Sequence, residues 1–441
     1  MSEFNAQFNW KCFAETEKFV CEILEKYCDE SAFLSSLKDK LKISSSTDLI
    51  VWVDHLVIES INVDLSALGY REEKRGHYSH SEALFPSILI GEKNALFLKV
   101  DSIAYFQMVH GCQGKIEGTP FSAYRTALVN DGPVDIYIVE RRGSKGIYQP
   151  AFESSQDLLV YLKAKELWSL RPRGLDHEKE AMKQTLEIAK QIRQWVGNKA
   201  SSIVLEVERE YWQHKNRAAQ IQKARQDSVG MGWANHDHHT FRASRTLFRS
   251  LVELFEILGF VCRERFYTGK EAGWGAQVME DVLGGFVLFL DVDLEPHELA
   301  IDFAHQELPP IKHLGTVGLW CALHGDSILH GGMHHLECQF NFDALREDLA
   351  KQGVGMMQPF SHFSYLKQAF TAGEWWPVSE QRIADLLHKQ LINAEEAEVF
   401  RTKGAVGSHL ENLERHEGYK GFNQKNVSFI IQQTDPRTLQ D

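Results

Sequence analysis

The chain has 441 residues, of which 43% are hydrophobic and 25% are charged, so it has the composition of an ordinary globular protein with room for two or more domains. Its formal net charge of −13 argues against nucleic acid or an anionic membrane surface as a main partner. The sequence contains no run of about 18 apolar residues, so we expect no membrane-spanning helix.

The seven cysteines are scattered along the chain and form no Cys-x-x-Cys pair. This pattern indicates neither a disulfide framework nor a zinc site built from cysteines. The N-terminal segment Met-Ser-Glu-Phe-Asn-Ala-Gln lacks the basic and apolar regions of a signal peptide. We therefore expect a protein of the reducing cytoplasm.

The N-terminal half is predicted to contain helices, then strands, then helices again. Apolar residues at helical spacing predict a helical segment within residues 1–48, and residues 49–165 read as a β-rich module. Its strands are expected at 49–59, 86–91, 96–106 and 134–140, with a hairpin turn at 142–146 that returns through Ile147 and Tyr148. Residues 166–230 are rich in Glu, Lys, Gln and Arg and predict long helices that link or brace two β-rich halves.

The C-terminal half, residues 231–441, alternates strands with helices. Strands are expected at 236–242, 260–267, 274–280, 286–293, 333–341, 413–419 and 427–432, and helices at 245–258, 342–352 and 379–400. Gly259 stands where the first of these helices should end, because glycine readily adopts the left-handed conformation of a helix C-terminus.

Two of these strands are rich in histidine. Side chains alternate between the faces of a strand, so His236, His238, Thr240 and Arg242 share one face of the first. In the second, His335, Glu337 and Gln339 form a polar face, while His334 lies on the face that carries Leu336 and Phe340. Strands with one polar and one mostly apolar face indicate a curved sheet or open barrel around a polar pocket, and favour a metalloenzyme.

A short repeat runs through the chain. Strands that open at Asp54-His55, Asp237-His238 and His334-His335 each lead through a helical stretch to a glycine, at 69, 259 and 353. In the first unit, His55 has no matching second histidine and carboxylate. We therefore expect the N-terminal module to be degenerate and structural.

A βα module with a histidine on its opening strand resembles the vicinal oxygen chelate superfamily, in which paired βαβββ modules form an open barrel around a divalent metal. The C-terminal half resembles more closely the 2-oxoadipate dioxygenase/decarboxylase (hydroxyglutarate synthase) family. The similarity lies in His238-His239-Thr240-Phe241-Arg242, Leu258-Gly259-Phe260, Arg265-Phe266-Tyr267, Ala272-Gly273, His334-His335-Leu336 and Gly407-Ser408-His409 with Leu413-Glu414-Arg415-His416. The resemblance implies an α+β fold of paired βαβββ modules with added helices.

The resemblance also implies the site residues. It makes His238, His335 and Glu414 the metal ligands, with Glu411 and Glu417 as alternatives to Glu414, and it makes Arg242 the group that holds the substrate carboxylate. Gln277 and Gln339 are expected to line the same cavity. His324 and His330 flank a Gly-Asp-Ser turn that is read as a surface loop.

Two imidazoles and a carboxylate form the facial triad of non-haem iron(II) oxygenases. We therefore expect Fe(II) as cofactor and oxidation, with O2, of a small carboxylate substrate of the 2-oxo acid class to a 2-hydroxy acid and CO2. The alternatives are a metal-dependent isomerase or hydrolase, and a non-catalytic binding protein, on the same scaffold. The sequence leaves open whether the chain forms a homodimer.

Overall fold

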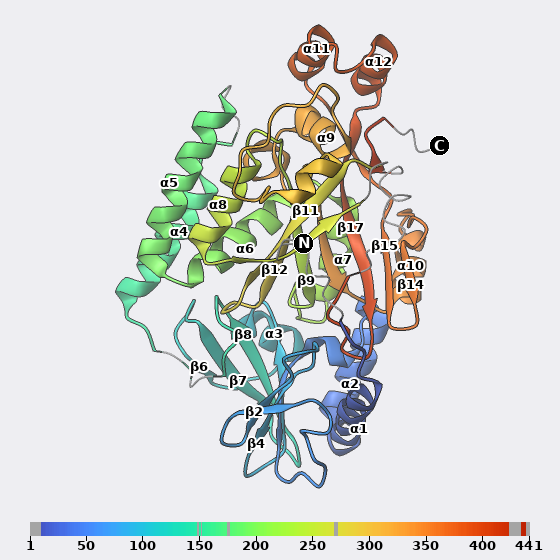
Figure 1. Ribbon diagram of the computed structural model, residues 1–441. Coiled ribbons are helices and arrows are strands. Elements are labelled where there is room, and N and C mark those ends of the chain that lie inside the picture. The colour runs from blue at the N-terminus through green and yellow to red at the C-terminus, as the bar shows by residue number, and fades with distance from the viewer. Residues whose placement is uncertain are drawn as a thin grey trace.

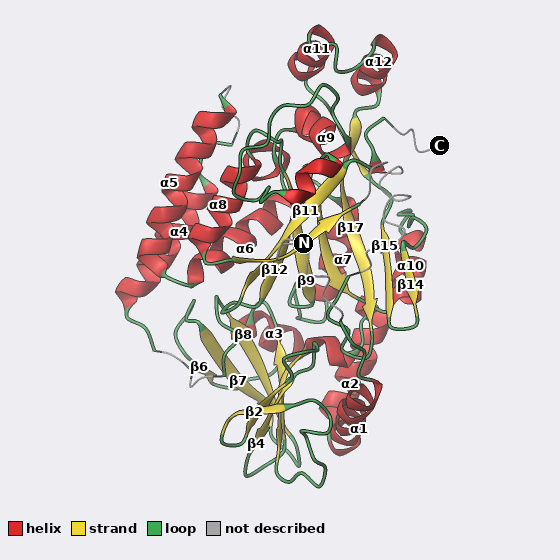
Figure 2. Cartoon of the chain, viewed as in Figure 1, coloured by secondary structure: helices red, strands yellow, loops and turns green. Residues whose placement is uncertain are grey.

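The computed structural model describes residues 10–147, 150, 152–173, 177–268, 272–422 and 434–437. It has the α+β architecture that the sequence predicts: two open mixed sheets, one above the other in Figure 1, with helices packed around them. Figure 2 shows that the helices gather beside the upper sheet and at the lower right edge of the molecule. Among the described residues, no helix combines the length and the apolar character needed to cross a membrane.

The elements have the following bounds. The helices are α1 Ala14–Glu30, α2 Ala32–Lys40, α3 Ile103–His110, α4 Ser155–Ser169, α5 Glu178–Val196, α6 Lys199–Gln213, α7 Arg217–Asp227, α8 Phe248–Leu258, α9 Thr316–His324, α10 Phe342–Lys351, α11 Glu380–His388 and α12 Ala394–Thr402. The strands are β1 Val53–Ile58, β2 Arg71–Lys74, β3 His77–Ser79, β4 Ser87–Ile90, β5 Ala95–Lys99, β6 Ile116–Glu117, β7 Tyr124–Asn130, β8 Asp135–Arg141, β9 His236–Arg242, β10 Val261–Tyr267, β11 Trp274–Asp281, β12 Phe286–Asp293, β13 His335–Gln339, β14 Ser361–Phe363, β15 Leu366–Phe370, β16 Glu374–Trp376 and β17 Ala405–Arg415.

The two sheets have the same strand order. The first runs β2-β3-β4-β1-β5-β8-β7-β6, and the second runs β10-β11-β12-β9-β13-β17-β15-β14, with β16 paired to β17. Each sheet therefore consists of two similar units whose opening strands, β1 and β5 or β9 and β13, meet antiparallel at its centre. The N-terminal half thus contains two such units, where the sequence predicted one.

The largest apolar core lies between the second sheet and the helices to its left in Figure 1. On α8, residues at a spacing of three and four (Phe248, Leu251, Val252, Leu254, Phe255 and Leu258) are buried. They pack with Phe241 of β9 and Leu290 of β12 in one cluster. The helix ends at Gly259, whose φ of 103° is left-handed, as predicted. This packing leaves the opposite face of β9, which carries His238 and Arg242, toward the interior of the open barrel.

Some predicted elements differ from the structure. The expected strand 96–106 is β5 followed by α3, and residues 49–52 form a short 3-10 turn before β1. The expected strand 413–419 is the end of a longer strand, β17, that begins at Ala405. Residues 144–147 form no returning strand, and Tyr148 and the expected strand 427–432 lie outside the described residues.

Candidate metal centre

Two imidazoles and one carboxylate converge on the inner face of the second sheet. They are His238 of β9, His335 of β13 and Glu411 of β17, and one ligand atom from each lies within 4.8 Å of the others. The strands are neighbours in the sheet, in the order β9-β13-β17. Their pairing brings together residues that are far apart in the sequence. Glu337 of β13 is paired with His238 on one neighbouring strand and with Glu411 on the other, and His335 lies two residues before Glu337. All four side chains therefore stand on one face of the sheet.

The distances fit a single cation site. Glu411 Oε2 lies 3.1 Å from His335 Nε2 and 3.8 Å from His238 Nε2. All three residues are buried, with 2–7% of their surface exposed. Two neutral imidazoles and a carboxylate are the ligand types that divalent iron and zinc accept. The residues present therefore fit a divalent metal.

Further residues orient this set. Glu337 Oε2 lies 2.6 Å from His238 Nδ1, which turns Nε2 of the same ring toward Glu411. The amide of Gln368 on β15 donates to Glu337 Oε1 at 2.7 Å and to Glu411 Oε1 at 3.4 Å. His335 Nδ1 lies 2.9 Å from His334 Nδ1. Carboxylates and other partners on the far nitrogen of a ligating histidine fix its ring and its tautomer.

The pKa shifts of His238 and Glu411 reflect the burial of several carboxylates close together. Burial opposes a charge on His238, but the carboxylates of Glu337 and Asp237 outweigh it and raise the pKa of His238 to about 9. Burial, reinforced by Glu337, raises the pKa of Glu411 well above its usual value. Both shifts have the sign expected where several carboxylates are buried close together.

The structure places Glu411, and not Glu414, beside the two histidines. Residues 411 and 414 are three apart, so they stand on opposite faces of β17. Glu414 instead accepts a hydrogen bond from the backbone N–H of Phe342 at 2.8 Å and lies 3.3 Å from Lys367 Nζ. The structure therefore does not bring the predicted ligand Glu414 to the two histidines, and the alternative Glu411 lies beside them instead. The other alternative, Glu417, follows the end of the strand.

Arg242 lies two residues beyond Thr240 on the same face of β9 and is 2% exposed. Its Nε is 3.8 Å from Asp291 Oδ2 on β12, and among the described residues Nε and Nη1 have no hydrogen-bond partner. Burial raises the pKa of Asp291 to about 7 although Arg242 opposes this rise. A buried guanidinium with two nitrogens that donate no hydrogen bond is costly unless a ligand accepts from it.

The structure does not bring Gln277, one of the two predicted glutamines, to the two histidines and Glu411. Gln277 of β11 pairs with Leu290, which shares the helix-covered core with Phe241, so it stands on the face turned away from His238. Its amide donates to the backbone carbonyls of Glu264 and Val278. Gln339 ends β13 half-buried, and its place in the cavity stays a prediction. Glu337 and Gln368, which were given no role from the sequence, contact His238 and Glu411 instead.

The other histidines of the region have separate environments. His334 and His409 are buried with their rings 5.2 Å apart, and Nε2 of each has no partner among the described residues. His324, which was expected on a surface loop, ends α9 and is 6% exposed, whereas His330 is exposed as expected. Aromatic rings wall the metal-ligand cluster, with Phe289 at 4.5 Å from the His238 ring and Phe370 at 4.9 Å from the His335 ring.

The first sheet has no equivalent set. If Asp54-His55 is aligned with Asp237-His238, the strand registers put Ala95 at the place of His335 and Tyr137 at the place of Glu411. The rings of His55, Phe97 and Tyr137 form a stack there, with centroids 3.9 and 4.4 Å apart. The same alignment matches the ion pair Arg141–Asp54 with Arg415–Asp237. At the aligned positions, His55 is therefore accompanied by Ala95 and Tyr137 and by no second imidazole or carboxylate.

Comparison with known proteins gives distant structural similarity only. No family model and no curated protein matches the sequence. Among solved structures, methylmalonyl-CoA epimerase from Mycobacterium tuberculosis is 12% identical over 41% of this chain and 88% of its own, with a TM-score of 0.24. A triple mutant of 4-hydroxymandelate synthase from Streptomyces coelicolor is 12% identical over 75% of this chain and 94% of its own (TM-score 0.29). The uncharacterized protein YdcJ from Shigella flexneri, which includes domain DUF1338, is 10% identical over 62% and 84% (TM-score 0.25). Such values assign no family to the chain.

Proposed function

We propose that this protein is a non-haem iron(II) dioxygenase of the vicinal oxygen chelate type that decarboxylates a small 2-oxo acid. The observation that carries the proposal is the convergence of His238 Nε2, His335 Nε2 and Glu411 Oε2 on one face of an open sheet. Two histidines and one carboxylate leave coordination positions free for substrate and O2, which four protein ligands in a closed tetrahedral site would not.

The bound iron would supply the activation of O2, and the protein residues would bind and orient the substrate. Arg242 would hold a carboxylate of the substrate through the N–H groups of Nε and Nη1, which form no hydrogen bond within the described part of the chain. Phe289 and Phe370 flank the metal-ligand rings and would exclude water from the reacting groups. Glu337, held by Gln368, would keep His238 in the orientation that turns Nε2 to the iron.

The overall reaction balances in atoms and electrons. A 2-oxo acid loses its carboxyl carbon as CO2 and is oxidised, while O2 is reduced. One oxygen atom of O2 enters the new carboxylate, and the other becomes the hydroxyl group of the 2-hydroxy acid. One O2 is therefore consumed for each CO2 released, and no further reductant is needed.

The test is the stoichiometry of O2, CO2 and product with protein reconstituted anaerobically with Fe(II). A series of 2-oxo acids with and without a second carboxylate identifies the chain length that is accepted. The matched control is the same protein loaded with Zn²⁺, which fits the ligands but does not activate O2. We expect equal uptake of O2 and release of CO2 with iron, and neither with zinc. Turnover that needs no O2 would overturn the dioxygenase and favour an isomerase or hydrolase. Binding without turnover under any metal would favour a binding protein.

A further inference from the structure

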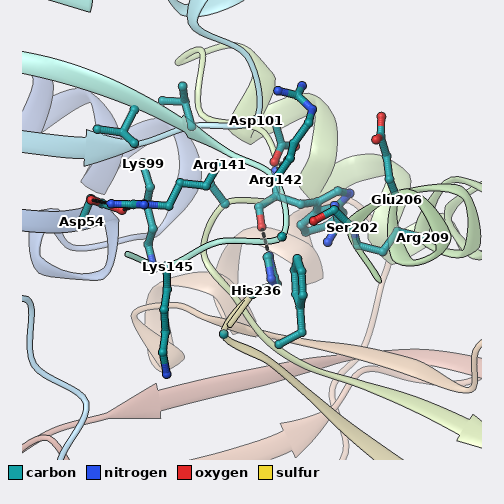
Figure 3. A pocket seen from close by; sticks show the side chains of 18 of the residues that line it. Asp54, Lys99, Asp101, Arg141, Arg142, Lys145, Ser202, Glu206, Arg209 and His236 are labelled. Atoms are coloured by element: carbon teal, nitrogen blue, oxygen red, sulfur yellow. Dashed lines mark hydrogen bonds and ion pairs between the residues drawn. The ribbon is translucent and has the colours of Figure 1, made fainter. Parts of the chain in front are cut away.

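A cavity of about 580 Å³ lies between the first sheet and the C-terminal half. It is lined by the start of β1, the ends of β5 and β8, helix α6 and the start of β9. Figure 3 shows that basic side chains from these separate elements, Lys99, Arg142 and Arg209 among them, gather around it. None of His238, His335 and Glu411 lines this cavity, so it is distinct from the metal centre.

Every carboxylate that lines the cavity already has a partner. Asp54 receives two hydrogen bonds from the guanidinium of Arg141, at 2.6 and 2.7 Å. Asp101 accepts from the backbone N–H of Trp233 at 2.6 Å. The remaining two, Glu206 and Glu210, both contact Lys165. Three of these carboxylates are thus paired with a cation, whereas Asp101 is not within the described residues; burial raises the pKa of Asp101, and the charge of Arg209 opposes this rise.

Several donors of the cavity lack such a partner. Among the described residues, Lys99 forms no ion pair, and the guanidinium of Arg209 donates only to the imidazole of His239, at 3.3 Å. Arg142 pairs through Nη2 with Glu140 at 2.6 Å, but its buried Nη1 has no partner among those residues. The hydroxyl of Ser202, a residue that is 7% exposed, has none either.

The position of Lys99 in the fold also points to a ligand. In the alignment of the two sheets, Lys99 takes the place of Gln339, at the mouth of the open barrel. The first sheet thus has the strand order of the second but carries an ammonium group where the second carries the amide of Gln339. Burial lowers the pKa of Lys99 below its usual value, and the charges of Asp54 and Asp237 offset this only in part.

We propose that this cavity binds a small dianion through its carboxylate or phosphate oxygens, which accept from Lys99, Arg209, Arg142 and Ser202. The bound anion would offset the desolvation of the unpaired cations, because charge-assisted hydrogen bonds are among the stronger polar contacts in proteins. Arg209, one of these donors, contacts His239, the residue that follows His238 on β9.

The experiment measures binding of inorganic phosphate and of succinate to the full chain by calorimetry at low ionic strength, after metal removal with a chelator. We expect saturable binding of at least one anion, and the comparison of the two distinguishes phosphate from carboxylate recognition. Lys99→Met should weaken the binding by about 10-fold or more, since it removes a charged hydrogen bond. Lys163→Met, at an exposed position of α4, removes the same charge and should leave binding unchanged.

A second measurement needs no variant. Lys99 of the native protein is acetylated by acetic anhydride and followed by peptide mass spectrometry, with and without the anion. A bound anion shields the amine and raises its pKa, so acetylation of Lys99 should slow while that of Lys163 does not change. The proposal is overturned if neither anion binds, if Lys99→Met binds as tightly as the wild type, or if neither anion protects Lys99.

Discussion

Replacing Glu411 by glutamine should abolish tight metal binding, whereas replacing Glu414 should not. The two residues lie on the same strand, but only Glu411 reaches His335 Nε2, at 3.1 Å. Glu411 also lies beside the buried carboxylate of Glu337, which raises its pKa together with burial. Glu411→Gln therefore removes a like-charge repulsion from the metal-free protein, which should be at least as stable as the metal-free wild type.

The magnitude follows from mass action. A metal present at about 100 times its Kd adds about 2.7 kcal/mol to the stability of a protein that binds it only when folded. Unfolding entropy is about 2.1 cal/mol/K per residue, so over 441 residues this addition raises Tm by about 3 °C. We expect this rise for the wild type and for Glu414→Gln, and almost none for Glu411→Gln. Glu414→Gln should instead lose about 1–2 kcal/mol with or without metal, because its hydrogen bond to the Phe342 N–H loses its charge.

The assay is differential scanning calorimetry of the three proteins with chelator and with Fe(II) under nitrogen, together with elemental analysis. The reasoning is refuted if Glu411→Gln retains the metal-dependent rise in Tm, or if Glu414→Gln loses it. Either result would mean that the ligand carboxylate comes from another residue.

Three further predictions concern neighbouring groups. Arg242→Met should raise KM for a 2-oxo acid by about 10- to 100-fold, because it removes a charged hydrogen bond. The control Arg249→Met changes an exposed arginine of α8 and should leave KM unchanged. An unchanged KM in Arg242→Met would refute the role of Arg242 as a carboxylate clamp. Glu337→Gln should weaken Fe(II) binding by about 10- to 100-fold in a metal titration through loss of the orientation of His238, and unaltered affinity would contradict that role. Glu17 and Glu414 raise the pKa of His416 to about 10, so its contribution to stability is complete below pH about 6.5 and is lost as the pH rises toward 10. His416→Gln should therefore flatten the fall in Tm over that range, by a small amount because this side chain is 43% exposed; an unchanged profile would show that the ion pairs do not stabilise the fold.

The strands that carry the histidines could be predicted from sequence because their polar and apolar residues alternate. The alternation of His236, His238 and Arg242 gave the bounds of β9 and the face that turns inward. The choice between Glu411 and Glu414 needed the start of β17, and the strand was expected eight residues too late, at 413 instead of Ala405. A wrong starting residue does not change which side chains share a face of the strand, but it left Glu411 outside the expected strand.

Other parts of the site depend on contacts that leave no local pattern. Gln368 reaches Glu337 only because β15 pairs with the far edge of β17, which no local periodicity reveals. The second unit of the first sheet was missed because Ala95 and Tyr137 stand at the positions of metal ligands, so the histidine signal of the repeat is absent there. Gln277 was misassigned because β11 is buried on both faces and shows no alternation.

The most direct test of the metal centre is anomalous diffraction at the iron edge from crystals of protein loaded anaerobically with Fe(II). We predict one strong peak per chain at about 2.0–2.2 Å from His238 Nε2, His335 Nε2 and a carboxylate oxygen of Glu411. A peak on the exposed group Glu256, Cys262 and His305 with none between the two buried imidazoles would contradict the proposed centre.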